Sequence, residues 1–247
     1  MDIETNGTLA YWNGQLVPTA SLAVPVFDAG FIQGLTVAEQ LRTFGGKIFR
    51  IEDHLKRLLR SLEIVGVDPG LSQSQFADVI HDMVKRNHAL LDDGDDIGVA
   101  LWVTPGPYKK FESITRPGPN VCCHTHPLDF HSWVEQYESG VRLVTSKIRQ
   151  VSTENWPAEL KCRSRMHYYL ADKEAREADP KARALLLDLD GFVCEASTAN
   201  ILAYIEGEGL VAPLQEKILP GISMSVLKEL AGTMGCLLYT SPSPRDS

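Results

Sequence analysis

The spacing of apolar and polar residues in the first half of the chain predicts hairpins and two amphipathic helices. Apolar runs flank Asn13-Gly14 in "LAYWNGQLV" and Gly45-Gly46 in "AEQLRTFGGKIFR", as is typical of β-hairpins. "IEDHLKRLLRSLEIVG" and "SQSQFADVIHDMVKRNHALL" follow the helical period. Their inward positions are Leu55, Leu58, Leu59 and Leu62 in the first helix, and Phe76, Val79, Ile80 and Val84 in the second. "DIGVALWVT" and "NVCCHTH" are expected to be strands.

The second half repeats this mixture of strands and helices. "VRLVTS" predicts a strand, and a helix is expected at about 163–178. "RALLLDLDGFVCE" indicates two strands around an Asp-Gly turn, and "NILAYIEGEGLVAP" indicates another hairpin. "LPGISMSVLKELAG" predicts a turn followed by a helix that starts near Gly221. Strands and helices do not alternate regularly, so the pattern favours an α+β fold over a doubly wound parallel one.

The composition changes in the middle of the chain, which suggests a domain boundary. Between Pro127 and Gly140 the residues are mostly polar and aromatic. We therefore expect a small N-terminal α+β domain at 1–126, a linker at 127–140 and a larger domain at 141–235.

Charge and cysteine content narrow the classes of function. The 247-residue chain has a net charge of −8, so it lacks the basic footprint of a nucleic-acid-binding protein. No apolar run is long enough to span a bilayer, and the start "MDIETNGTLA" does not resemble a secretory signal. The five cysteines are odd in number and include the adjacent pair Cys122 and Cys123, which is a poor disulfide framework. The sequence therefore favours reduced thiols and a cytoplasmic protein with no membrane partner.

The segment "VCCHTHPLDFH" collects groups that zinc can bind. Its candidate ligands are Cys122, Cys123, His124, His126 and His131. In a strand, alternation would place only Cys122, His124 and His126 on one face, and this spacing matches no common zinc site. We therefore predict no metal site.

Two further features are compatible with chemistry but do not establish it. Lys161, in "ELKCRSRMHYYLADKEA", precedes a helix. A lysine that reacts as a neutral amine must be partly desolvated, whereas most lysines are solvated surface charges. "LPGIS" opens a helix whose N-terminal N–H groups would suit a phosphate, although a plain turn is the simpler interpretation.

Taken together and in order, these pieces resemble class IV of the pyridoxal-phosphate (PLP) aminotransferases. The matching parts are "HLKRL", the lone Lys161 before a helix, "LLLDLDGFVCEASTANI" and "ILPGIS". The spacing of the lysine, Glu195 and Leu219 is also similar to that of the family. The resemblance covers about Tyr11 to Gly235 and implies a fold-type IV enzyme, with two domains built on antiparallel-rich sheets.

The resemblance implies a role for each matching residue. Lys161 corresponds to the lysine that forms the internal aldimine and then moves the proton between the substrate carbon and the cofactor. Glu195 corresponds to the carboxylate that faces the pyridine nitrogen and keeps the ring an electron sink. The remaining cofactor-binding residues are Arg57 for the phosphate, the backbone N–H groups of Ile222 and Ser223 for the same phosphate, and Leu219 against the ring. Asn200 matches a family asparagine that is expected to be structural.

The chain departs from the family pattern where substrate would be recognised. "GLTVAE" stands in place of "GDGVFE", so Ala38 replaces an aromatic residue of the substrate pocket. Pro105 stands where the D-amino-acid enzymes carry an arginine, and Met224 and Ala196 replace a common arginine and glycine. Arg42, Arg163 and Arg165 are candidates for binding a carboxylate, or else belong to a solvated face. Substrate identity and stereochemistry therefore stay open.

The resemblance implies transfer of an amino group from an amino acid, with the branched-chain type favoured, to a 2-oxo acid by a homodimer. One alternative is a lyase of the aminodeoxychorismate type, which would release pyruvate without an amino acceptor. A second alternative is a non-enzymatic remnant of the fold, which the departures favour. Retention of Lys161, Glu195 and Arg57 argues against that remnant.

The last twelve residues, "CLLYTSPSPRDS", do not continue the family pattern. Ser-Pro-Ser-Pro cannot extend a helix or pair in the middle of a sheet. The segment can be back-translated into a transposon end joined to a sequencing adapter. We therefore interpret 236–247 as an artefact, the preceding domain as incomplete, and a natural disordered tail as the alternative.

Overall fold

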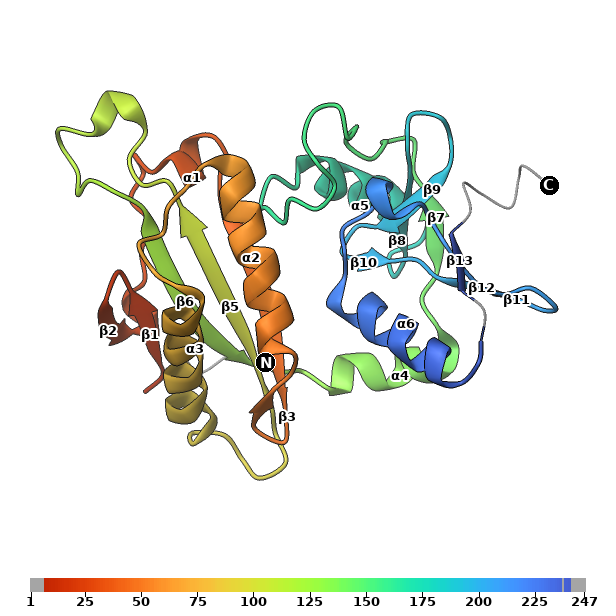
Figure 1. Cartoon of the computed structure of the whole chain (residues 1–247), viewed down its shortest axis with the longest axis horizontal. Coiled ribbons are helices and arrows are strands. Elements are labelled where there is room, and N and C mark those ends of the chain that lie inside the picture. The colour runs from red at the N-terminus through yellow and green to blue at the C-terminus, as the bar shows by residue number, and fades with distance from the viewer. Residues whose placement is uncertain (1–6, 237, 241–247) are drawn as a thin grey trace. The chain divides into compact units, whose positions relative to one another are not determined.

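Two compact units make up the protein in the computed structural model, which describes residues 7–236 and 238–240 (Figure 1). The first unit runs to Phe130 and also includes Lys161–Ser164. The second unit comprises His131–Leu160 and the chain from Arg165 onward. Sequence analysis assigns Lys161–Ser164 to the second domain, so the chain enters the first unit twice.

A six-stranded antiparallel sheet forms the first unit. Its strands are β1 (Leu9–Trp12), β2 (Gln15–Pro18), β3 (Val37–Phe44), β4 (Lys47–Ile48), β5 (Ile97–Thr104) and β6 (Asn120–Pro127), in the order β2-β1-β6-β5-β3-β4. Asn13 and Gly14 have φ angles of 51° and 89°, which the tight β1–β2 turn requires. Gly45 and Gly46 also have positive φ between β3 and β4. Both hairpin predictions are confirmed.

Two helices cover one face of this sheet, α2 (Ile51–Val65) and α3 (Gln73–His88) (Figure 1). Leu55, Leu58 and Leu62 of α2 are buried, as are Phe76, Ile80 and Val84 of α3, whereas Leu59 and Val79 are only half-buried. A capping box between Ser72 and Gln75 fixes the start of α3. Short helical turns at α1 (Ala29–Ile32), η1 (Thr19–Ser21) and η2 (Lys109–Phe111) complete the unit.

A four-stranded sheet and one helix build the core of the second unit. The strands β7 (Leu143–Thr145), β8 (Arg183–Leu187), β9 (Val193–Ala196) and β10 (Ala199–Asn200) are ordered β10-β9-β8-β7, and only β7 and β8 are parallel. Helix α5 (Met166–Ala178) packs on β7 and β8 through Ala171 and Ala175. Helix α4 (His131–Ser139) occupies much of the range interpreted as a linker.

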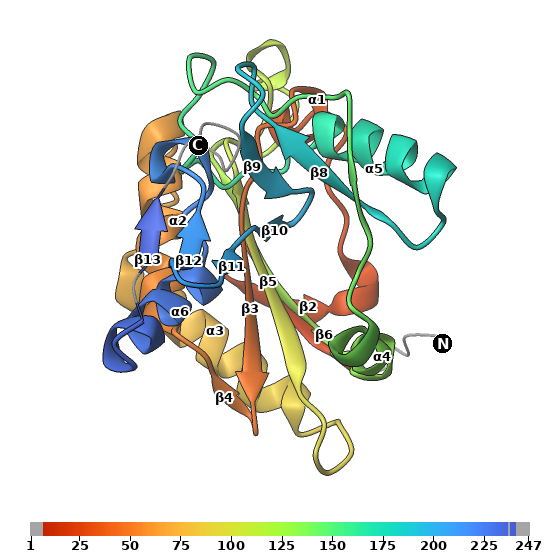
Figure 2. The ribbon, with the colours of Figure 1, turned by 90° about the vertical axis from the view of Figure 1, so that its right-hand side faces the viewer.

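A smaller sheet lies in the same unit, as Figure 2 shows. It contains β11 (Ala203–Ile205), β12 (Gly209–Ala212) and β13 (Leu238–Thr240), with η3 (Gln215–Lys217) and α6 (Ile222–Thr233) between β12 and β13. Strand β13 pairs in parallel with β12, so these three residues of the segment 236–247 do pack. Residues 237 and 241–247, on which the rest of the artefact interpretation depends, lie outside the described residues.

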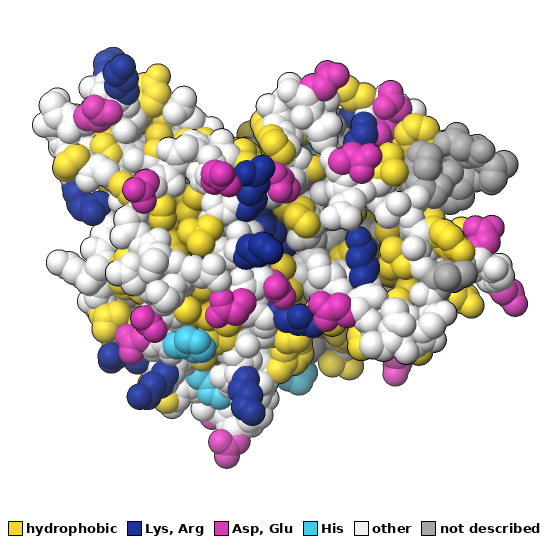
Figure 3. Space-filling view, in the orientation of Figure 1, with side chains coloured by type: hydrophobic (Ala, Val, Ile, Leu, Met, Phe, Trp, Pro, Cys, Tyr) yellow, Lys and Arg dark blue, Asp and Glu magenta, His cyan; other side chains and the backbone are white. Residues whose placement is uncertain are grey.

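Helices and antiparallel-rich sheets in both units confirm the α+β prediction. Among the described helices, none combines the length and the apolar character needed to cross a bilayer. On the face drawn in Figure 3, acidic and basic side chains are interspersed. The surface charge there is mixed, in keeping with the absence of a basic footprint in the sequence.

Candidate active site

Arg57 of α2 is held by a buried carboxylate in the first unit. Its Nε and NH2 atoms each donate to Glu39 of β3, at 2.8 Å to the two carboxylate oxygens. His54 Nδ1 lies 2.8 Å from Oε2 of the same carboxylate. Burial opposes ionisation of Glu39, but the hydrogen bonds from Arg57 and His54 and the charge of Lys161 hold its pKa below the usual value. This network fixes the direction of the Arg57 guanidinium.

Lys161 is anchored in the first unit through its backbone. Its carbonyl oxygen accepts from Ala38 N at 3.1 Å, and Cys162 forms a bridge with Val37, so the chain here runs along β3. Its own N–H donates to Ser61 Oγ at 3.1 Å. Ser61 is fully buried and stands one helical turn after Arg57 on α2. One helix therefore orients Arg57 and also fixes the backbone of Lys161.

Glu195 of β9 is the centre of a hydrogen-bond network in the second unit. Its Oε1 atom accepts from Tyr168 OH at 2.5 Å and from Gln150 Nε2 at 2.6 Å. Its Oε2 atom accepts from Leu219 N at 3.3 Å. The side chain is 5% exposed, and this burial raises its pKa although each hydrogen bond acts in the opposite direction.

The chain segment after Leu219 joins Glu195 to the start of helix α6. Asn200 Nδ2 donates to Leu219 O at 2.9 Å. Gly221 is the N-cap of α6 and makes no side-chain cap, so backbone N–H groups open the helix at Ile222 and Ser223. A β-carbon at Gly221 would overlap Asn200 Oδ1, so only glycine fits this close approach.

These groups fit the two polar ends of PLP. A carboxylate suits the cationic ring nitrogen, and the N-terminus of a twelve-residue helix suits the phosphate. Leu219 connects them within one unit through its hydrogen bonds to Glu195 and Asn200. The donor set of the second unit is therefore compatible with the cofactor.

The six predicted site residues fall into two groups. Arg57 and Lys161 belong to the first unit, and Glu195, Leu219, Ile222 and Ser223 belong to the second. Sequence reasoning missed the groups that hold them, namely Glu39, His54, Ser61, Gln150 and Tyr168. The sequence offered one signal for Glu39, because this residue directly follows Ala38 in the segment "GLTVAE". Gln150 and Tyr168 gave none, because they reach Glu195 from 45 and 27 residues away in sequence.

Three of the residues that depart from the family pattern can be placed on the described elements. Ala38 is buried and binds Lys161 through its backbone, and Met224 is buried in the first turns of α6. Pro105 directly follows β5. In the described chain no group of three or more potential metal ligands comes together.

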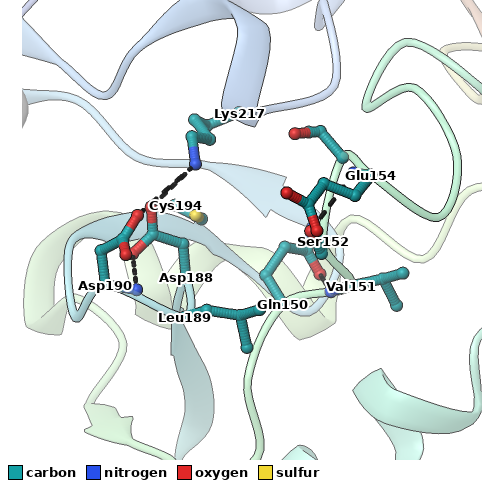
Figure 4. Close-up of a pocket in the computed structure, with 10 residues that line it drawn as sticks. Gln150, Val151, Ser152, Glu154, Asp188, Leu189, Asp190, Cys194 and Lys217 are labelled. Atoms are coloured by element: carbon teal, nitrogen blue, oxygen red, sulfur yellow. Dashed lines mark hydrogen bonds and ion pairs between the residues drawn. The ribbon is translucent and has the colours of Figure 1, made fainter.

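A pocket of about 170 Å³ lies in the second unit (Figure 4). Lys217 Nζ lies in it, 3.4 Å from Asp188 and 3.9 Å from Asp190. Asp188 Oδ1 also accepts from Asp190 N and Phe192 N, so it organises the Asp-Gly turn between β8 and β9. Gln150, which binds Glu195, and Cys194, the neighbour of Glu195 on β9, are among the residues that line this pocket.

Comparison with known proteins identifies the family to which the chain belongs. Residues 36–239 match the family described as amino-transferase class IV, and the chain belongs to this family. The chain is thus a transferase of the fold-type IV class, as the sequence predicts.

Three similar proteins illustrate the match. A putative branched-chain-amino-acid aminotransferase of Methanocaldococcus jannaschii is 28% identical over 94% of this chain and 77% of its own length. A D-alanine aminotransferase of Staphylococcus epidermidis is 25% identical over 91% of this chain and 76% of its own. The branched-chain amino acid aminotransferase from Thermobaculum terrenum, solved in its PLP form, shares the fold with a TM-score of 0.79 and 19% identity. That structural match covers 95% of this chain and 76% of the other.

Proposed function

We propose that the protein binds PLP and transfers the amino group of an amino acid, of the branched-chain type, to a 2-oxo acid. The observation that carries this proposal is the arrangement around Glu195, where a buried carboxylate and the α6 N-terminus are joined through Leu219. Family membership supports the reaction type. The names of relatives such as the M. jannaschii protein support the substrate class.

Each protein group has a defined task in this reaction. When bound, PLP supplies an electron sink for the charge that develops on the substrate α-carbon. Lys161 would hold the cofactor through Nζ and would accept and return the α-proton. Glu195 would supply a negative charge toward the ring nitrogen. Arg57, oriented by Glu39, would bind the phosphate, and the N–H groups of Ile222 and Ser223 would bind it from the start of α6.

Lys161 belongs to the first unit and Glu195 to the second. We also propose that the working form is a homodimer, as the family resemblance implies. The five cysteines, all among the described residues, form no disulfide, which supports a cytoplasmic location.

Two alternatives make different predictions. A lyase would release pyruvate from an aminodeoxychorismate-like substrate without any oxo acid. A non-enzymatic remnant would neither bind PLP nor turn over. The comparisons favour the aminotransferase, because the relatives described above are named aminotransferases. A coupled assay for pyruvate in the absence of 2-oxoglutarate separates the lyase from the aminotransferase.

The decisive experiment is chemical fixation of the cofactor. The protein is incubated with PLP and reduced with borohydride, and the modified peptide is identified by mass spectrometry. The adduct is expected on Lys161 and should be absent from Lys161→Ala, while Lys47→Ala, at an exposed lysine of β4, should retain it. An adduct on another lysine in Lys161→Ala, or retained turnover, would overturn the assignment.

A further inference from the structure

The two oxygens of Glu195 are used unequally. Oε1 accepts hydrogen bonds at 2.5 Å from Tyr168 OH and at 2.6 Å from Gln150 Nε2, which fill its two lone-pair positions. Oε2 accepts only the longer bond of 3.3 Å from Leu219 N among the described residues. One lone-pair position on Oε2 therefore stays open, on the oxygen that bonds to Leu219.

The hydrogen bonds around Glu195 determine which group donates in each contact. Gln150 Oε1 accepts from Val151 N at 3.2 Å, which places the amide NH2 toward Tyr168 and Glu195. Gln150 Nε2 donates to Tyr168 OH at 3.0 Å as well as to Glu195. Because the tyrosine oxygen accepts from the amide, its hydroxyl proton points at Glu195. Both contacts to Oε1 are thus hydrogen bonds donated to a carboxylate, which are stronger than neutral ones.

Burial and hydrogen bonding act in opposite directions on the pKa of Glu195. Burial raises this pKa, while the hydrogen bonds from Tyr168, Leu219 and Gln150 and the nearby charge of Arg165 oppose the rise. Burial also raises the pKa of Tyr168, so its hydroxyl keeps its proton. Tyr168 packs against the alanine-rich core of α5 and β8, which limits its freedom to turn away.

We propose that Tyr168 and Gln150 are positioning residues that occupy Oε1 of Glu195 and so direct Oε2 to the pyridine nitrogen of the cofactor. The proposal rests on the proposed function, since it assigns that nitrogen to Glu195. It goes beyond that function because it predicts that recognition of the ring nitrogen depends on two side chains that act through the carboxylate of Glu195.

The test compares PLP with a PLP analogue that carries carbon in place of the ring nitrogen. The dissociation constant of each is measured by fluorescence titration of the apo form of the full chain, for wild type, Tyr168→Phe and Gln150→Met. Wild type should bind PLP more tightly than the analogue. Each substitution should reduce this preference about tenfold, because a charge-assisted hydrogen bond to Glu195 is lost. Affinity for the analogue should change little.

Matched variants make the outcomes distinct. Tyr169→Phe removes the hydroxyl of the neighbouring tyrosine, which is 64% exposed, and should keep the wild-type preference. If Tyr168→Phe fails to fold, Gln150→Met carries the test alone. A wild-type protein that binds PLP without any preference would overturn the role of Glu195, and with it the proposed function. A wild-type preference that both variants retain, or equal loss of affinity for both cofactors, would overturn the positioning role only.

Discussion

Asn200 lies directly opposite Glu195 in the pairing of β10 with β9, and both side chains bind the backbone of Leu219. The asparagine amide donates to the Leu219 carbonyl, and the Leu219 N–H donates to the carboxylate. The peptide segment that leads into helix α6 is thus held on both sides by one antiparallel pair. The family asparagine, expected to be structural, therefore binds the same backbone segment as Glu195.

Gly221→Ala should disrupt this scaffold without unfolding the unit. The new β-carbon would overlap Asn200 Oδ1, so the amide must leave Leu219 and the start of α6 must shift. We expect PLP affinity to fall tenfold or more, on the scale of one lost charge-assisted hydrogen bond at the helix start. Titration of PLP absorbance measures the effect.

Gly232→Ala is the matched control for that change, because it lies in the same helix and its β-carbon would meet nothing within 4 Å. It should raise the free energy of unfolding by about 0.5–1 kcal/mol, as alanine is the better helix former, and leave PLP affinity unchanged. Equal PLP affinity in the two variants would contradict the role of the Asn200 contact.

Glu195→Gln should lower turnover much more than cofactor affinity. The amide can accept hydrogen bonds but carries no negative charge, and the charge matters most when the α-carbon becomes negative. We expect kcat to fall about a hundredfold or more while the dissociation constant of PLP rises less than tenfold. Glu177→Gln, at an exposed position of α5, should change neither value. Unchanged turnover in Glu195→Gln would show that this carboxylate does not face the ring nitrogen.

Ser61→Ala should weaken the anchoring of Lys161. The change leaves the Lys161 N–H without its acceptor and should destabilise the protein by about 1–3 kcal/mol. Ser72→Ala, which removes the N-cap of α3, should destabilise it by about 1 kcal/mol. Only Ser61→Ala should slow the covalent attachment of PLP, which is measured as the change in absorbance after mixing. Equal attachment rates in both variants would refute the link.

Gly106→Ala should be among the most destabilising small substitutions in the first unit. Gly106 has a φ of 86°, and a β-carbon there would overlap the carbonyl oxygen of Gly118. Gly14 has a similar φ of 89° but open space around it, so Gly14→Ala measures the backbone strain alone, about 1 kcal/mol. In urea unfolding, the free energy of unfolding should fall by at least about 2 kcal/mol more in Gly106→Ala than in Gly14→Ala. Equal losses would show that the loop moves freely.

Asp96 should make stability depend on pH in the acid range. Its pKa is lowered because hydrogen bonds from Thr43, Gly46 and Gly45, with the charge of Arg42, outweigh its burial. Because the folded-state pKa is lowered, Asp96 stabilises the protein fully at pH values above the usual pKa of about 3.8. This stabilisation is lost as the pH falls through the folded-state pKa.

Urea titrations at pH 6 and pH 3 test this dependence on Asp96. The free energy of unfolding should fall less between these values in Asp96→Asn than in wild type, because asparagine does not titrate. Asp93→Asn, at an exposed position of the same loop, should behave like wild type. Identical slopes for Asp96→Asn and wild type would contradict the prediction.

The sequence predicts what is local, and the structure adds what is distant along the chain. The hairpins at Asn13-Gly14 and Gly45-Gly46 follow from short-range turn chemistry, so they were predictable. Motif spacing identified Glu195 and Leu219 as candidates, but no local pattern indicates that Gln150 and Tyr168 bind the same carboxylate oxygen. The linker expected at 127–140 rests on a change of composition, which does not exclude a helix, and the structure forms α4 within that range.

The membership of Lys161–Ser164 in the first unit has a consequence for the gene. The chain leaves that unit after Phe130, returns at Lys161 and leaves again after Ser164. A single cut therefore cannot yield two self-contained modules: a fragment that ends at Phe130 exposes the edge of β3 where Cys162 pairs with Val37. Recombination that exchanges whole domains would separate Lys161 from the sheet that anchors it, so the two units are expected to be inherited together.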